Sequence, residues 1–144
     1  MANRLINPPQ LYDGAPHGLS HGVLAPAGAL LFVSGQVAWD QEYRVTDGTV
    51  SGQFAHALAN VRTVLEAADA SVADLVQLRI YVRGEIGEHM ATVAPVLAAF
   101  VGAARPAVTG VGVASLASPD TLVEVEAVAR VGAPGDAAPG DAPR

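Results

Sequence analysis

Two glutamates stand two residues apart in the segment Leu122-Val123-Glu124-Val125-Glu126-Ala127. Successive side chains of a strand point to opposite faces, so Glu124 and Glu126 are expected on the same face. The apolar residues between them then face the other way, toward a core. A carboxylate in this position is either an ordinary solvated group or, inside a cleft, a general acid or base.

A second polar segment, Ser34-Gly35-Gln36, interrupts an apolar run of strand type over residues 29–39. A glycine inside a strand often marks a bulge or the close approach of another group. The backbone N–H groups of this segment would then be available to hold a carboxylate. The alternative is an ordinary bulge without a ligand.

Two of the four histidines, His17 and His21, are four residues apart, but Pro16, Gly18 and Gly22 are incompatible with a helix there. They therefore do not form a helical metal pair. The chain has no cysteine and no cluster of acidic residues at ligand spacing, so we expect no metal. Walker, dinucleotide-binding and nucleophile-elbow motifs are also absent, and we expect no cofactor.

The length and charge of the chain limit the classes of protein to which it can belong. A chain of 144 residues fits one domain. Its net charge of −6, without a basic stripe, argues against nucleic-acid binding. No apolar run approaches about 18 residues, so we expect no membrane span, and the N-terminal segment does not resemble a signal peptide. The lack of cysteine suits a reducing compartment, and we expect a cytoplasmic protein.

The composition is unusually apolar for a chain without a membrane segment. Hydrophobic residues make up 51% of the chain and charged residues 15%, whereas average soluble domains have about 25% charged residues. One explanation is apolar surface buried between subunits. The other is a genome composition that favours alanine and valine, and both can hold.

Apolar residues at steps of three and four predict two amphipathic helices, over 51–68 and 88–101. Ser51 is the expected N-cap of the first helix. Pro95 lies inside the second, which should therefore start late or bend.

Six strands are expected from apolar alternation or short apolar runs, and residues 1–22 are expected as an extended lead-in. The strands fall near 23–24, at 29–39, at 43–46 as a hairpin arm, and at 75–83, 106–113 and 122–131. Two helices can cover only one face of the resulting sheet. The other face needs another cover, and a partner subunit is the obvious candidate. Residues 1–131 then form a single domain, and the proline-rich, repetitive segment 132–144 is expected as a disordered tail.

Taken together, the segments resemble the reactive intermediate deaminase family, also called Rid, YjgF-like or UK-type. The similarity covers roughly residues 19–131 in the right order, and the matching residues are Leu31 to Gln36, Ala59-Asn60-Val61 with Leu65, Ile80-Tyr81-Val82, Arg105-Pro106-Ala107, and Leu122 to Ala127. The resemblance implies a chorismate-mutase-like α/β (α+β) fold, with a mixed sheet and two helices on one face. It also implies a homotrimer with small-molecule clefts between neighbouring subunits.

Well-known members of this family hydrolyse reactive enamines and imines, such as 2-aminoacrylate, to 2-oxo acids and ammonia. The resemblance implies an arginine, two residues after the proline of the Pro-Ala pair, that clamps the substrate carboxylate. Here Pro106-Ala107 is followed by Val108. Arg105 is three residues away and is expected on the opposite strand face, which leaves Arg79 or Arg83 to reach in from a neighbouring strand or subunit.

Other family positions are partly retained. The resemblance places Glu124 at the cleft glutamate and keeps Ser34, while Gly110 stands at a cysteine position and His21 at a tyrosine position. With Val108 and Gly110 on one strand face, the cleft should be roomier and less polar than a deaminase site. A lost charge-assisted pair is worth on the order of 1.5–3 kcal/mol, which weakens 2-aminoacrylate-type deamination.

The resulting hypothesis is a trimer that acts on a small-molecule substrate by acid–base chemistry. Its catalytic residues would be Glu124 and His21, and its substrate-binding residues Ser34, Gly35, Val108, Gly110 and Arg79. Imine or enamine deamination is what the family implies, and isomerisation, cyclisation or hydrolysis of a larger apolar substrate is equally open. A non-catalytic ligand-binding or chaperone-like trimer is the second hypothesis. A ribonuclease or translation inhibitor, attached to some relatives, is disfavoured by the acidic charge.

Overall fold

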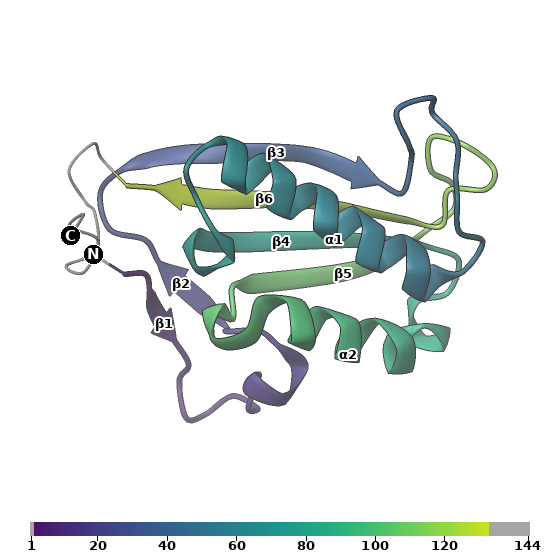
Figure 1. Ribbon diagram of the computed structural model, residues 1–144. Coiled ribbons are helices and arrows are strands. Elements are labelled where there is room, and N and C mark those ends of the chain that lie inside the picture. Colours follow the sequence, from purple (N-terminus) through teal and green to yellow (C-terminus); the bar gives the residue numbers. More distant parts are fainter. Residues whose placement is uncertain (1, 133–144) are drawn as a thin grey trace.

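One mixed sheet with two helices on a single face forms the body of the molecule (Figure 1). The computed structural model describes residues 2–132, so all but the first residue of the predicted tail over 132–144 lies outside the described part. The sheet order is β3 (Ala29–Val37), β6 (Val123–Val131), β4 (Leu75–Arg83) and β5 (Ala107–Val113). Only the β4–β5 pair is parallel. The predicted fold class is thereby confirmed.

Helix α1 (Val50–Ala67) begins one residue before its predicted start, and this shift moves the cap. Thr49 is the N-cap, because its backbone is extended and its side chain accepts the Gly52 N–H at 3.1 Å. Ser51 lies inside the helix, so its prediction as the cap was wrong.

Helix α2 (Met90–Val101) begins two residues later than predicted, because a 3₁₀ turn over Ile86–Glu88 precedes it. Pro95 therefore lies beyond the first turn. The helix starts late, as one of the two expectations had it, but the later start does not bring this proline into the first turn. Among residues 2–132, neither this helix nor any other is both long and apolar enough to cross a membrane.

The N-terminal lead-in contains a strand that the sequence does not reveal. β1 (Arg4–Ile6) pairs antiparallel with β2 (Gly22–Leu24). The Ser20 N–H then donates to the Pro106 carbonyl at 3.0 Å. This bond attaches the lead-in to the start of the edge strand β5.

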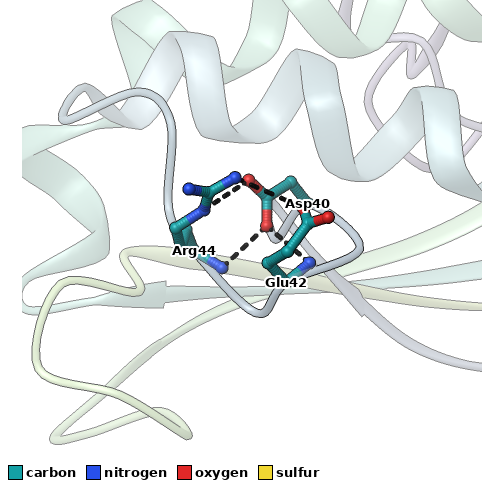
Figure 2. Close-up of polar contacts among 3 residues, drawn as sticks. All are labelled: Asp40, Glu42 and Arg44. Atoms are coloured by element: carbon teal, nitrogen blue, oxygen red, sulfur yellow. Dashed lines mark hydrogen bonds and ion pairs between the residues drawn. The ribbon is translucent and has the colours of Figure 1, made fainter.

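The hairpin arm predicted at 43–46 is wrong, because a polar turn occupies this part of the chain (Figure 2). Asp40 accepts the backbone N–H groups of Glu42 at 2.8 Å and Arg44 at 3.0 Å, and the Arg44 Nε donates to the same carboxylate at 3.0 Å. Tyr43 adopts a positive φ of 65° inside the turn. Only an isolated bridge, Trp39 to Val45, remains of the expected pairing.

The inner face of the sheet is apolar, and α1 and α2 pack on it. Buried members of this core include Phe54, Leu58 and Leu65 of α1, Leu97 of α2, Leu78, Ile80 and Val82 of β4, and Val123 and Val125 of β6. The opposite face, here called the open face, carries Phe32, Arg79, Tyr81, Glu124 and Glu126. No element of the described chain covers it (Figure 1).

Gln53 is a fully buried polar residue that joins three parts of the chain. Its Nε2 donates to the carbonyls of Asp47 at 2.9 Å and Asp120 at 2.8 Å, and its Oε1 accepts the Leu122 N–H at 2.7 Å. The side chain thus ties the start of α1 to the loops before α1 and before β6.

Replacing Gln53 by methionine should lower the free energy of unfolding by roughly 2–4 kcal/mol, because buried carbonyls and one buried N–H lose their partners. Urea denaturation at equal chain concentration measures the change. Gln41→Met at an exposed position is the matched control and should shift stability by less than about 0.5 kcal/mol. Equal effects of the two changes would contradict the bridging role.

The pKa of Asp40 is lowered from its ordinary 3.8, mainly by the backbone hydrogen bond from Arg44. A carboxyl with a lowered folded-state pKa stabilises the fold above its unfolded pKa, and this contribution is lost as the pH falls through the folded pKa. We expect an NMR titration of Asp40 with a midpoint below 3.8. Arg44→Ala keeps the backbone N–H and should retain most of the shift. A midpoint restored to the ordinary value by that change would contradict the assignment.

Candidate functional site

Glu124 and Glu126 both project from β6 to the open face, as the strand alternation predicts. The register of the sheet places Tyr81 of β4 beside Glu124, and Arg79 beside Glu126. The intervening Val125 is fully buried on the inner face. The two carboxylates therefore share one surface with the polar side of β4.

Glu126 is committed to its neighbours on β4. The Tyr81 hydroxyl donates to Glu126 Oε1 at 2.5 Å, and the Arg79 guanidinium lies 3.5 Å from the same oxygen. The hydrogen bond to Glu126 is the main cause of a raised pKa of the Tyr81 hydroxyl. Glu126 thus links β6 to β4 through its Oε1 atom.

Glu124 differs from its neighbour in having no such partner. Within residues 2–132 its side chain makes no hydrogen bond and no ion pair, and it is half-buried. The carboxylate lies against Gly35, where a Cβ would overlap Glu124 Oε1. Gly35 therefore makes the room that this carboxylate occupies.

A bulge explains how Gly35 comes so close. The pairing of β3 with β6 shifts register between Val33 and Gln36, so that Ser34 and Gly35 have no direct partners in the ladder. The sequence left a bulge and a carboxylate-holding segment as alternatives. The bulge is present, and the group that approaches it is the chain's own Glu124.

A hollow of about 330 Å³ lies on the open face, next to this bulge. Ser34 and Arg79 come together in it, and its other lining residues are Phe32, Val33, Gln77, Glu126, Ala127 and Val128. Two of the predicted substrate-binding residues thus share one surface. Arg79 contributes there as the ion-pair partner of Glu126.

Val108 and Gly110 line a different hollow, on the helix side of the sheet. This hollow, here called the α2 pocket, measures about 220 Å³ and is lined by Tyr12, His17, Leu19, Ile80, Ile86, Met90, Val93, Ala94, Leu97, Val108 and Gly110. Their shared face agrees with the alternation along β5. Within one chain, the sheet itself lies between this pocket and Glu124.

None of the three candidate arginines lines the α2 pocket in the described chain. Arg79 faces the open side and pairs with Glu126. Arg83 donates to the Pro119 carbonyl. Arg105 lies before β5 with a positive φ of 38°, so the expectation that treated it as part of a continuous strand was wrong.

His21 lies beside the lead-in, away from Glu124 in the same chain. Its Nε2 is 2.8 Å from the Tyr12 carbonyl, and its backbone N–H donates to the Asn7 side chain at 3.0 Å. Its ring meets Tyr12 edge-on, with centroids 4.6 Å apart. Because a carbonyl oxygen only accepts, Nε2 carries the proton, and Nδ1 is the position left to act as a base.

Tyr12 and His17 are two pocket-lining residues that the sequence analysis did not propose for substrate binding or catalysis. Both line the α2 pocket, and their rings are 6.3 Å apart in an edge-on arrangement. Tyr12 lies in the lead-in, where no periodicity predicts its direction. Among residues 2–132, no group of three or more histidine and acidic side chains is placed to hold a metal ion.

Comparisons with known proteins agree with this geometry. A family model described as endoribonuclease L-PSP matches residues 14–131. A RutC family protein of Pyrococcus horikoshii is 32% identical over 104 residues, which are 72% of this chain and 80% of the relative.

Solved structures give the same result. YyfB of Yersinia pestis, a conserved Rid-family protein of unknown function, matches with a TM-score of 0.85 and 38% identity, over 91% of this chain and all of that one. Escherichia coli TdcF, solved with bound serine, matches with a TM-score of 0.63 and 27% identity, over 78% and 87% of the two chains. The chain therefore belongs to the Rid/YjgF family, the family of the endoribonuclease L-PSP model.

Proposed function

We propose that this chain is a trimeric enzyme that acts on a small imine, enamine or related carbonyl tautomer by acid–base chemistry. The observation that carries the proposal is the contrast between two neighbouring glutamates. Glu126 is held by Tyr81 and Arg79, whereas Glu124 is half-buried and unpaired within the described chain. A positioned carboxylate without a structural partner is suited to proton transfer.

The active cleft is proposed to lie between subunits. Glu124 is on the open face and the α2 pocket is on the other side of the same sheet, so one small molecule cannot touch both within one chain. A closed ring of three copies would bring Glu124 of one subunit toward β5 of the next. Exposed apolar residues on the open face support such burial: Phe32 is 72% exposed and Val111 39%.

The chemistry assigned to this cleft is the addition of water to a C=N bond. Glu124 accepts a proton from a water molecule while the oxygen of that water bonds to the imine carbon, and the imine nitrogen takes up a proton. Glu124 then returns its proton to the nitrogen of the resulting carbinolamine, and the C–N bond breaks so that ammonia leaves. The hydroxyl releases a proton as the carbonyl forms, which balances the proton first taken up by the nitrogen. His21 is proposed as the second site for proton exchange, through its Nδ1 atom.

A ligand-binding trimer without catalysis is the second candidate, and it has one specific support. TdcF, a relative of similar fold, was solved with bound serine, which shows that this architecture can hold a small amino acid in that protein. Cleavage of RNA, which the family description names, is disfavoured here by 14 acidic against 8 basic residues.

Glu124→Gln should reduce turnover by roughly 10²–10⁴-fold, because the amide cannot accept the proton. The assay generates imines from leucine and phenylalanine with an amino-acid oxidase and follows release of the 2-oxo acid. Glu126→Gln, on the same strand face, is the matched control and should keep most of the rate. Turnover that survives Glu124→Gln would exclude acid–base catalysis at Glu124 and leave the ligand-binding trimer.

The trimer is tested separately by light scattering. We expect a mass three times that of the 14.6 kDa chain. Phe32→Glu should give the mass of one chain, because it places three charges in the buried centre of the assembly. Ala59→Glu adds the same charge to an exposed helix position and should leave the trimer intact. A wild-type monomer would remove the proposed cleft.

A further inference from the structure

Two glycines on the same face of β5 have opposite surroundings. A Cβ at Gly112 would collide with the carbonyl oxygen of Gly84, so the close approach of the backbone requires glycine there. A Cβ at Gly110 would meet nothing within 4 Å. Packing therefore does not demand glycine at 110, and the missing side chain leaves the α2 pocket open.

The α2 pocket contains no lysine, arginine, aspartate or glutamate among its lining residues. Its walls are aliphatic, with Val93 and Leu97 of α2 on one side and Ile80 and Val108 of the sheet on the other. A carboxylate placed there would lose hydration without gaining a lysine or arginine partner. An uncharged apolar group would lose little and would fill the space.

The size of the pocket sets the size of its occupant. Its volume of about 220 Å³ exceeds that of an engineered apolar cavity of about 150 Å³ that binds benzene. An aromatic ring with a small substituent, or a branched alkyl chain, would fit.

The lining of the pocket includes two residues with polar ring atoms, Tyr12 and His17. Tyr12 is 64% exposed and stacks edge-on against both His17 and His21. These rings offer hydrogen-bonding partners to the polar part of a ligand whose apolar part lies against the aliphatic walls.

We propose that the α2 pocket binds an uncharged aromatic or branched-alkyl side group of the substrate, and that Gly110 sets the specificity by keeping this space open. The assignment rests on the proposed function in one respect, that the same molecule reaches Glu124 of a neighbouring subunit. The enzyme would then select substrates by an apolar group where the family resemblance implies a carboxylate clamp.

The test uses two probes with the same ring and different charge, acetophenone and benzoate. Each is titrated into the ¹⁵N-labelled full chain, and amide shifts are followed by NMR. We expect acetophenone to shift amides of 90–97 and 108–110 and to bind at least roughly tenfold tighter than benzoate. Benzoate binding equal to or tighter than acetophenone binding, or shifts elsewhere in the chain, would overturn the proposal.

Gly110→Leu fills the pocket from β5 and should weaken acetophenone binding by at least roughly tenfold. Gly48→Leu, at a glycine with equally open surroundings in a loop, is the matched control and should bind acetophenone as the wild type does. Ala94→Leu fills the same space from α2. It replaces Gly110→Leu in the binding test if Gly110→Leu does not fold. Unchanged binding in the filled variants would contradict the assignment.

Glu124→Gln separates this proposal from the proposed function. It should bind acetophenone as the wild type does, because binding in the pocket needs no proton transfer. Failed binding with Glu124-dependent turnover intact would remove only the pocket assignment. Intact binding with turnover independent of Glu124 would remove only the acid–base mechanism.

Discussion

A sheet has two faces, and this chain supplies helices for only one of them. α1 and α2 pack on the inner face, where Phe54, Leu58 and Leu97 meet the apolar side of the strands. The open face keeps both large apolar groups and the two glutamates of β6. Burial of that face in an assembly would remove its apolar groups from water. It would also enclose the unpaired carboxylate of Glu124 in a cleft, where it could act on a ligand.

Because the sheet separates its two faces, the residues of the proposed site lie on two different surfaces of one chain. The sequence resemblance groups Glu124, Ser34, Val108 and Gly110 into one cleft, yet a single chain holds the first two on the open face and the last two in the α2 pocket. The division is a direct consequence of strand alternation, since neighbouring strands present these residues to opposite sides. The cleft that we propose therefore requires a second copy of the chain.

Long periodic elements were predictable, and features that depend on register or on single contacts were not. The strand Leu75–Arg83 was predicted at its observed bounds because every second residue from Val76 to Val82 is apolar. Strand β1 has three residues, which are too few for an alternating pattern to predict it. The turn at Asp40 depends on side-chain acceptance of backbone N–H groups, which periodicity does not reveal. Tyr81 lies opposite Glu124 in the ladder, yet its hydroxyl bonds to Glu126. The contrast between the two glutamates therefore depends on side-chain directions that the sequence does not reveal.

Mixed trimers test most directly whether the site is shared between subunits. Glu124→Gln and Gly110→Leu chains, each with reduced turnover of the imine of phenylalanine when alone, are refolded together in equal amounts. If Glu124 and the α2 pocket of one cleft come from neighbouring subunits, random mixing restores about a quarter of the wild-type activity, because one in four clefts combines two intact halves. If both come from the same chain, no activity returns, and the central claim is wrong.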